Sequence, residues 1–170
     1  VHLQRAVIVS EDDLFLQHGG VQWEALEKAR QRNERASAQA LRQGRSTQRL
    51  VGASTITQQL AKNLFLSGER TLLRKGQELI LTLMLEAMLD KRRILEIYLN
   101  HVEWGQGVFG AQAAARRYFG KNAADLNEWE AARLAVMLPR PKWYEKNPDS
   151  PYWADRAEVI LVRMSGVKIP

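Results

Sequence analysis

Three consecutive acids, Glu11, Asp12 and Asp13, stand near the start of the chain, directly after a segment whose apolar residues recur at helical spacing. That spacing predicts a helix that ends at Glu11. A carboxylate at the C-terminal end of a helix meets the negative end of the helix dipole, which costs roughly 0.3–1 kcal/mol. Acids in this position are therefore either exposed and tolerated or kept for a function. The triplet alone favours an ordinary loop acid.

Five polar side chains follow in a segment that has the pattern of a helix N-terminus, namely Ser54, Gln58, Gln59, Lys62 and Asn63. Free N–H groups at such an end suit phosphates and sugar oxygens. Thr55 together with Gln58 fits a capping box, which explains part of the row without any function. Gln59, Lys62 and Asn63 are not explained by capping. They predict a polar binding surface.

A third segment carries three cations and one acid, Arg70, Arg74, Lys75 and Glu78. Arg74 and Glu78 are four residues apart, so a salt bridge within one helix, worth roughly 0.3–0.5 kcal/mol, is the simplest interpretation. Function can coexist with it, because a group of fixed cations stabilises a departing phosphate. A fourth segment, residues 91–104, mixes polar and apolar side chains and predicts mainly structural roles.

Helical periodicity accounts for most of the chain, and no stretch of useful length alternates as a strand would. Further helices are predicted over residues 22–43, from residue 54 or 55 to Gly68, and over 74–100, 111–118 and 128–138. We expect Ile56, Leu60 and Leu64 to form the buried face of the second of these. Residues 74–100, as one long helix or two abutting ones, are apolar on more than one face and should be the core element. The fold class predicted is all-α (mainly α), in one domain.

The composition of the 170 residues, 45% hydrophobic and 26% charged, suits one globular domain with a buried core. A net charge of +6 suits an anionic partner, whether nucleic acid, membrane surface or phosphorylated substrate, and equally a solvated basic face with no specific partner. Seven Lys or Arg and two Glu between residues 27 and 49 suit a segment that faces solvent or lipid. The absence of cysteine excludes disulfides and thiolate metal sites. The longest apolar run, residues 79–85, is far shorter than the roughly 20 residues that span a bilayer.

These segments, in this order and spacing, resemble the conserved blocks of the peptidoglycan glycosyltransferase family (glycosyltransferase family 51). The most specific part is the run from Ser54 to Leu60, with the acidic segment upstream and residues 74–78 downstream. The resemblance extends from Leu3 to about Met164. Because no penicillin-binding domain is attached, the chain is most similar to the monofunctional biosynthetic peptidoglycan transglycosylases of that family.

The resemblance implies a reaction and the residues that perform it. The 4-hydroxyl of the acceptor's N-acetylglucosamine attacks the anomeric carbon of a lipid-linked donor with inversion, so that lipid II is polymerised and undecaprenyl pyrophosphate leaves. Glu11 matches the catalytic base, with a pKa that its acidic neighbours and the helix end would raise. Glu78 matches a second glutamate that orients cations or a divalent metal. The positions that match donor-phosphate contacts are Lys62, Arg70, Arg74 and Lys75, and those that match the groove are Ser54, Gln58, Gln59 and Asn63.

The resemblance also implies a fold and a cellular setting. The expected fold is a lysozyme-like head lobe with a small membrane-proximal jaw lobe at about residues 21–51. No organic cofactor is expected, while a divalent cation (Mg²⁺ or Mn²⁺) is expected to fit at the pyrophosphate. The partners implied are lipid II, the growing lipid-linked strand, the membrane surface, and cell-division or penicillin-binding proteins. The domain would lie on the outer, periplasmic face of the cytoplasmic membrane, held by an N-terminal transmembrane helix that is absent from this chain.

Two other functions remain open from the sequence. A lysozyme-like peptidoglycan-cleaving enzyme shares the fold class, but it uses two carboxylates and has no need of a cation cluster. A nucleic-acid-binding module is suggested by charge alone, and the chain lacks a recognition helix or stacking aromatics for it. In the main interpretation, His18 and Gly20 are predicted to support the turn after the acids.

Overall fold

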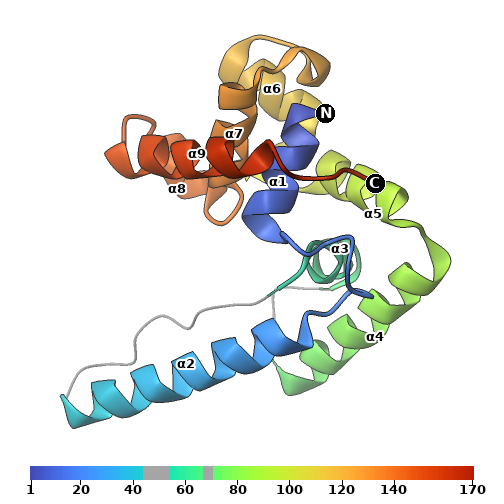
Figure 1. Ribbon diagram of the computed structural model, residues 1–170, viewed down its shortest axis with the longest axis vertical. Helices are drawn as coiled ribbons and strands as arrows, with labels where there is room; N and C mark the ends of the chain where they lie inside the picture. The colour runs from blue at the N-terminus through green and yellow to red at the C-terminus, as the bar shows by residue number, and fades with distance from the viewer. Residues whose placement is uncertain (44–53, 67–70) are drawn as a thin grey trace.

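The computed structural model describes residues 1–43, 54–66 and 71–170, and this part of the chain is mainly helical, as predicted (Figure 1). A short two-stranded antiparallel sheet, β1 (Glu103–Gly105) and β2 (Val108–Phe109), and a 3₁₀ turn, η1 (Ala123–Asp125), complete it. The helices are α1 (His2–Glu11), α2 (Trp23–Arg42), α3 (Ile56–Phe65), α4 (Leu72–Met88), α5 (Lys91–His101), α6 (Ala111–Phe119), α7 (Glu128–Met137), α8 (Pro141–Lys146) and α9 (Pro151–Met164).

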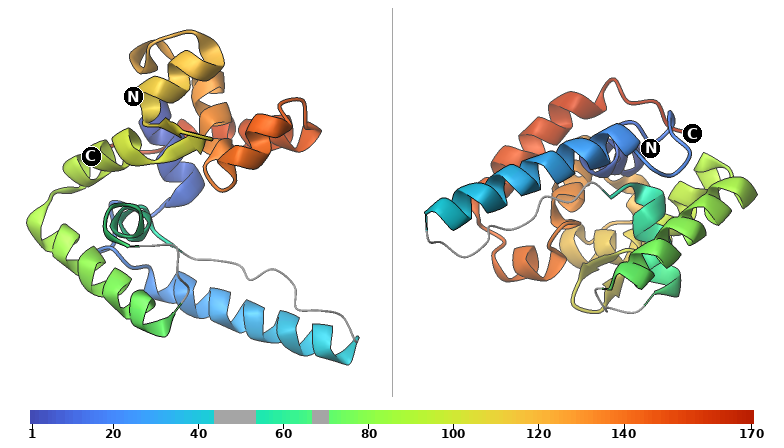
Figure 2. Two further views of the ribbon diagram at one scale, coloured as in Figure 1. Left: turned by 180° about the vertical axis from the view of Figure 1, so that it is seen from behind. Right: turned by 90° about the horizontal axis from the view of Figure 1, so that it is seen from below.

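The hydrophobic core lies in a head formed by α1 and α5 to α9 (Figures 1 and 2). There α7 packs against both α1 and α9, and α1 also contacts α9. Val7, Leu134 and Met137 are fully buried between these helices, and α5 adds Ile94 and Leu95 to the same cluster. Each such side chain stabilises the fold by about 1.5–3 kcal/mol. The end of α1, where the three acids stand, is therefore held on a rigid support.

The N-terminus of α3 forms as predicted. Thr55 caps the helix by accepting the Gln58 N–H, and the Thr55 N–H donates to Gln58 Oε1 at 3.0 Å, so the capping box is confirmed. Ile56 and Leu60 are buried, but the prediction is wrong for Leu64, which is 37% exposed in the last full turn. The predicted end of this helix at Gly68 lies outside the described residues.

Of the two alternatives for residues 74–100, the structure has two helices, α4 and α5, separated by a bend. Asp90 lies in the bend and caps α5, where its Oδ1 accepts the Arg93 N–H at 2.7 Å. The expectation of a core element holds for α5 and is wrong for α4, whose Leu73 and Met88 are each 75% exposed. The physical reason is the bend, which turns α4 away from the head so that it packs mainly on α3 (Figure 2). The apolar face of α4 is therefore left open.

The β-hairpin was not predicted, because strands of three and two residues are too short to show alternation. Its turn contains Gly107, with φ 75°. Gly110, with φ 84°, follows the hairpin, and a Cβ there would lie 2.7 Å from the carbonyl oxygen of Asn100. Only glycine fits this close approach. The glycines that interrupt the helical pattern thus make the return between α5 and α6.

Helices α2 and α4 lie on the far side of α3 from the head (Figure 1). Trp23 and Leu26 of α2 are 61% and 40% exposed, whereas Ala29 is buried. The predicted jaw lobe, about residues 21–51, includes α2, and its last part, residues 44–51, lies outside the described residues. Among the helices of the described ranges, none has the length and apolar character needed to cross a membrane.

Candidate active site

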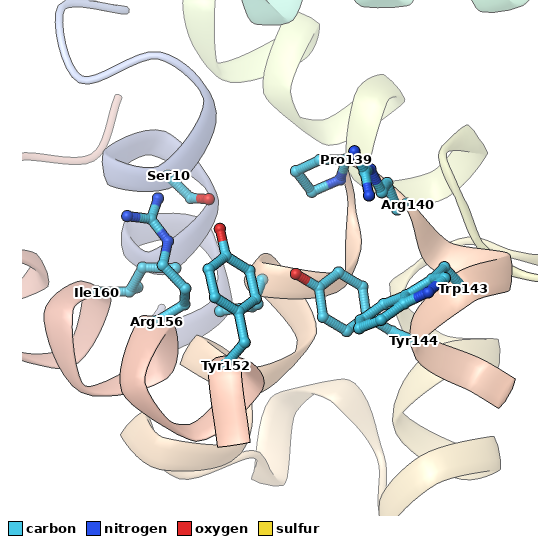
Figure 3. A pocket seen from close by; sticks show the side chains of 9 residues that line it. Ser10, Pro139, Arg140, Trp143, Tyr144, Tyr152, Arg156 and Ile160 are labelled. Carbon is cyan, nitrogen blue, oxygen red and sulfur yellow. The ribbon is translucent and has the colours of Figure 1, made fainter. Parts of the chain in front are cut away.

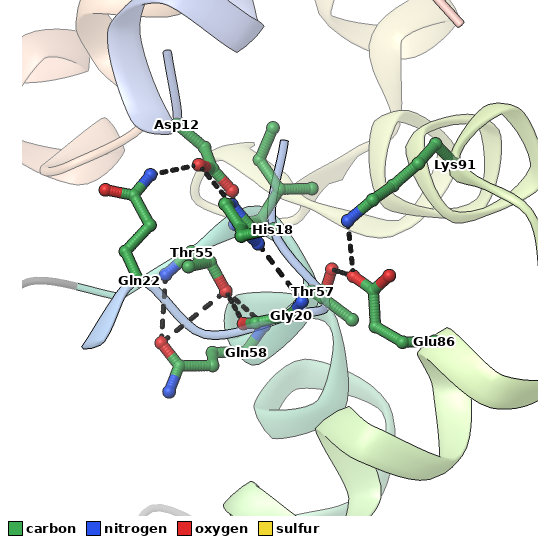
Figure 4. A network of polar contacts seen from close by, with 10 residues as sticks. Asp12, His18, Gly20, Gln22, Thr55, Thr57, Gln58, Glu86 and Lys91 are labelled. Atoms are coloured by element: carbon green, nitrogen blue, oxygen red, sulfur yellow. Dashed lines mark hydrogen bonds and ion pairs between the residues drawn. The ribbon is translucent and has the colours of Figure 1, made fainter. Parts of the chain in front are cut away.

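The C-terminal end of α1 meets the N-terminal end of α3, and Asp12 joins them (Figure 4). The side chain of Asp12 is fully buried. Its Oδ2 accepts the N–H of Ile56, the first residue of α3, at 3.0 Å, and its Oδ1 accepts from Gln22 Nε2 at 2.6 Å. A carboxylate at a helix N-terminus is stabilised by the free N–H groups and the dipole. The dipole of α3 therefore offsets that of α1, a pairing that no spacing in the sequence indicates.

His18 and Gly20 support the turn after the acids, as predicted. The Nε2 atom of His18 lies 2.8 Å from Asp12 Oδ1, while its Nδ1 accepts the Gly20 N–H at 3.0 Å. Because a backbone N–H can only donate, the imidazole is neutral and carries its proton on Nε2. Gly20 has φ 90°, and its carbonyl oxygen accepts a hydrogen bond from Thr55 Oγ1 at 2.6 Å. The turn is thus fixed to both α1 and α3.

Glu11, the last residue of α1, has a partly buried carboxylate that lines a cavity of about 230 Å³. Its Oε2 accepts from Gln59 Nε2 at 2.8 Å. Burial raises the pKa of Glu11 above its ordinary value of 4.5, and the charge of Asp12 adds to this. Hydrogen bonds from Gln59 and Ser10 and the charge of Lys62 oppose the rise in pKa. Burial, rather than the predicted like charge and helix dipole, is the main cause, and the result is a better proton acceptor at working pH.

The raised pKa of Glu11 predicts the acidic limb of the pH–activity profile. Only the ionised carboxylate accepts a proton, so kcat/KM should fall as the pH is lowered through a pKa above 4.5. The measurement is kcat/KM against pH, with circular dichroism at each pH to show that the fold is kept. A limb at or below the pKa of an ordinary exposed glutamate would contradict this account of Glu11.

Glu78 lies on the side of α4 that faces the protein, and only 4% of its side chain is exposed. The Nη2 atom of Arg74 is 4.0 Å from its Oε2, which confirms the predicted salt bridge, and the Lys75 ammonium bonds to its Oε1. Glu78 therefore holds two cations in place. The side chains of Arg74 and Lys75 come from the first turns of α4, the helix that packs against α3.

Glu78 is not part of a metal site formed by the described residues alone. Both of its oxygens already face cations, and within the described residues no three His, Cys, Asp or Glu side chains gather as metal ligands. Mg²⁺ bound through one carboxylate takes most of its ligands from water and substrate phosphates. A divalent cation therefore stays a prediction that would depend on the substrate and would require Lys75 to move.

Two of the predicted groove residues lie beside Glu11. Ser54 is exposed and lines the same cavity as Glu11. Gln59 binds Glu11 directly. Lys62, predicted to face phosphate, is exposed on α3 and close enough for its charge to act on Glu11. The structure thus brings together the acid, the amide and one cation.

The remaining predicted residues are placed differently. Gln58 is buried, and its side-chain oxygen is taken by the cap of α3, so its contact in the structure is structural. Asn63 is exposed on α3. Arg70 lies outside the described residues. Contact of these residues with substrate stays a prediction.

A polar cluster that the sequence pattern did not single out ties α3, α4 and α5 together (Figure 4). Glu86 accepts from Thr57 Oγ1 at 2.5 Å and from Lys91 Nζ at 2.7 Å. The Lys91 ammonium also lies 4.6 Å from the centre of the Phe15 ring, a cation–π distance. The cluster was missed because its members are far apart in the sequence and ordinary at their own positions. It fixes the bend between α4 and α5 against the turn that follows the acids.

Tyr98, which lies in the fourth segment and was expected to be structural, contacts a residue of the site. It is 1% exposed on α5, and its hydroxyl donates to Gln59 Oε1 at 2.9 Å. Gln59 therefore lies between Tyr98 and Glu11. Only the meeting of α3 and α5 in the fold could indicate this.

A second cavity, of about 260 Å³, lies on the head side of Ser10, the residue before Glu11 (Figure 3). The hydroxyl groups of Ser10, Tyr144 and Tyr152 face the space between α1, α8 and α9. Aromatic rings offer stacking surfaces for sugars, and the guanidinium groups of the lining suit anionic groups. The full lining is Ser10, Val136, Pro139, Arg140, Trp143, Tyr144, Tyr152, Arg156 and Ile160. Two cavities thus share Ser10 near the end of α1.

Comparison with known proteins gives matches over the whole chain. A family model described as transglycosylase matches residues 1–165, a range that includes every site residue named above. A biosynthetic peptidoglycan transglycosylase of Bordetella avium is 56% identical over 170 residues, which is 100% of this chain and 68% of the relative. Proteins of the same name from a Janthinobacterium strain and from Bordetella pertussis are 53% and 52% identical, over 99% of this chain and 69% and 67% of the relatives.

Proposed function

This chain belongs to the transglycosylase family, and from that premise we propose that it is a peptidoglycan glycosyltransferase that polymerises lipid II into linear glycan strands. Its substrates are then lipid II and the growing lipid-linked strand, and its work is cell-wall synthesis at the cell envelope. The reaction inverts the donor's anomeric centre and releases undecaprenyl pyrophosphate.

The observation that carries the proposal is the unequal placement of the three acids at the end of α1. Glycoside hydrolysis commonly uses two acids, one on each side of the scissile bond. Glu11 and Asp13 both line the cavity, but Asp13 is half exposed and pairs with Arg163 at 3.2 Å, and Asp12 is buried with both oxygens in hydrogen bonds. Glu78, in turn, holds Arg74 and Lys75. Among the described residues this arrangement favours transfer assisted by one base over hydrolysis by two acids.

Each side of Glu11 then has a substrate. The donor carries a pyrophosphate, which needs cations, and these stand on the α3–α4 side as Lys62, Arg74 and Lys75. The acceptor carries sugars, which suit the hydroxyl and aromatic cavity on the head side of Ser10. Ser10 and Glu11 are adjacent, which supports a base between the two proposed substrate positions.

The chemical step follows from this placement. The acceptor's 4-hydroxyl transfers its proton to the Glu11 carboxylate as its oxygen bonds to the donor's anomeric carbon. The bond from that carbon to the phosphate oxygen breaks, and the departing pyrophosphate takes the electron pair. Lys62, Arg74 and Lys75 stabilise the charge that develops there, and Glu78 keeps the last two oriented. Arg70 joins them by resemblance.

Incubation with radiolabelled lipid-linked precursor tests the function. We expect lysozyme-sensitive glycan polymer and free undecaprenyl pyrophosphate, with moenomycin abolishing both. Finished peptidoglycan, supplied in a parallel reaction, should remain intact. Release of soluble fragments from it, without any polymer from the precursor, would establish the hydrolase instead.

We also propose that the side of the molecule formed by α2 and α4 contacts the membrane. Leu73, Ile80, Met84 and Met88 follow one another on one face of α4, and all are exposed. Exposed Lys and Arg side chains along α2 suit anionic head groups: Lys28, Arg30, Arg32, Arg35 and Arg42. An N-terminal membrane anchor outside this chain and cell-division or penicillin-binding partners belong to the same proposal, on the family resemblance alone.

If the membrane contact is correct, vesicle binding depends on both the exposed apolar face of α4 and the basic side chains of α2. Co-sedimentation with phosphatidylcholine vesicles should rise steeply when phosphatidylglycerol is added, since each basic residue near an anionic surface contributes about 1 kcal/mol. Replacing Ile80 and Met84 by Gln should weaken binding at least about 10-fold, because burying even one such side chain is worth roughly 1.5–3 kcal/mol. Val162→Gln is the matched control, since Val162 is 77% exposed on α9 of the head. Equal losses in both variants, or indifference to lipid charge, would count against the contact.

A further inference from the structure

A continuous line of side-chain hydrogen bonds runs from α5 through α3 to the end of α1. The Tyr98 hydroxyl donates to Gln59 Oε1 at 2.9 Å, and Gln59 Nε2 donates to Glu11 Oε2 at 2.8 Å. Tyr98 belongs to the core cluster of the head, with 1% of its surface exposed. The line therefore begins on a rigid part of the molecule and ends on the carboxylate proposed as base.

An amide side chain has a direction, because one end donates and the other accepts. With its N–H₂ toward Glu11, Gln59 binds the ionised carboxylate. With its oxygen toward Glu11, two acceptors would face each other unless the carboxyl were protonated. The contact that Tyr98 makes adds to the preference for the first orientation, since its O–H donates to the amide oxygen and so leaves the N–H₂ toward Glu11.

Tyr98 is available as a donor here. Burial, followed by the charges of Glu11 and Asp12, raises the pKa of Tyr98 well above its ordinary value, so the hydroxyl keeps its proton. The other charged group that acts on Glu11 is Lys62 of α3. Neither Asp12, whose oxygens are bound elsewhere, nor Lys62, which is exposed, sets the direction of the Gln59 amide.

We propose that Tyr98 is a positioning residue for the general base: its hydroxyl fixes the Gln59 amide, which in turn orients Glu11 and favours its ionised form. The inference rests on the proposed function, because it assigns Glu11 the role of base. Tyr98 itself does not touch substrate in this assignment. It acts through Gln59.

Tyr98→Phe tests the proposal with almost no change of volume. Once the amide is free to turn, Glu11 loses a bond that favours its charged form, so its pKa rises and the acidic limb of the kcat profile moves to higher pH. We expect kcat at neutral pH to fall roughly 10-fold, the order expected when a reacting group loses its alignment, with KM for lipid II changed less than about twofold. In a Gln59→Ala background the same substitution should have no further effect on the limb.

Tyr118→Phe is the matched control. The Tyr118 hydroxyl also donates a hydrogen bond, to the Trp104 carbonyl at 2.9 Å, and this contact does not involve Glu11, Asp12 or Asp13. It should leave the acidic limb in place. An unmoved limb in Tyr98→Phe, or equal changes in both variants, would overturn the proposal and reduce Tyr98 to a structural role. A wild-type enzyme that makes no polymer would overturn the proposed function instead.

A measurement on the unaltered protein covers the case in which Tyr98→Phe does not fold. In ¹³C and ¹⁵N spectra, the Gln59 side-chain amide signals should titrate with the midpoint of the Glu11 carboxyl, which is assigned by its loss in Glu11→Gln. Amide signals that stay constant while Glu11 titrates would contradict the link between the two side chains and, with it, the role of Tyr98.

Discussion

Glu11→Gln should lower polymerisation of lipid II by at least about 100-fold, because positioned general bases contribute roughly 10²–10⁴-fold to rate. The glutamine keeps an oxygen that can accept from Gln59 Nε2, so the surroundings of the site change little. What is lost is the group that takes the acceptor's proton. The rate of strand formation from labelled precursor, at saturating substrate, measures the effect.

The control for this variant is its stability, and the sign of the change is informative. Burial raises the pKa of Glu11 in the folded chain, so between 4.5 and the folded pKa the native state binds more protons than the unfolded state. The free energy of unfolding therefore falls as the pH rises through that window. Glu11→Gln removes this cost and should be at least as stable as the parent at neutral pH, with the difference vanishing below 4.5. A variant that is inactive because it is less stable at neutral pH would not support Glu11 as base.

Asp12→Ala should lower the free energy of unfolding by roughly 3 kcal/mol or more. Breaking a buried, fully bonded carboxylate leaves its former partners unsatisfied, and here these are the N–H of Ile56 at the start of α3 and the side chains of His18 and Gln22. Activity should fall as well, since the turn and the ends of both helices lose their shared anchor. Urea unfolding followed by circular dichroism measures the loss.

Asp13→Ala is the comparison for Asp12→Ala. Asp13 is the next acid along the chain, and its 3.2 Å pair with Arg163 is half exposed on both sides. Exposed pairs are worth about 0–1 kcal/mol, so the unfolding midpoint should hardly move. If the two alanine variants lost similar stability, the assignment of Asp12 as the joint between α1 and α3 would be wrong.

Local patterns predicted the parts of this fold that depend on neighbouring residues. The capping box of Thr55 and Gln58 and the salt bridge of Arg74 with Glu78 need only spacing along one helix, and both are present. The exposed face of α4 could not be predicted, because an apolar helix in a core and one facing outward have the same periodicity. The difference lies in the bend at Asp90, which depends on how α3 packs.

The site shows the same division between local and distant information. Glu11 and Lys62 could be nominated from residue type and family resemblance. The Asp12 carboxylate is stabilised by the N–H of Ile56, which is distant in the sequence. The link from Tyr98 to Glu11 passes through Gln59, which is 48 residues from Glu11 and 39 residues from Tyr98. Contacts of such separation arise only when three helices meet, so a single sequence read along its length does not contain them.

The cluster of Thr57, Glu86 and Lys91 has a mechanical consequence. It locks α4 at a set angle to α3 and, through the contact of Lys91 with Phe15, to the turn beside Glu11. If α4 rests in the lipid interface, the depth to which it sinks determines the height of Glu11 above the bilayer. The fold would then keep the Glu11 carboxylate at the same distance from the bilayer as the pyrophosphate of a membrane-anchored substrate. Every sugar would be added at that one distance from the membrane.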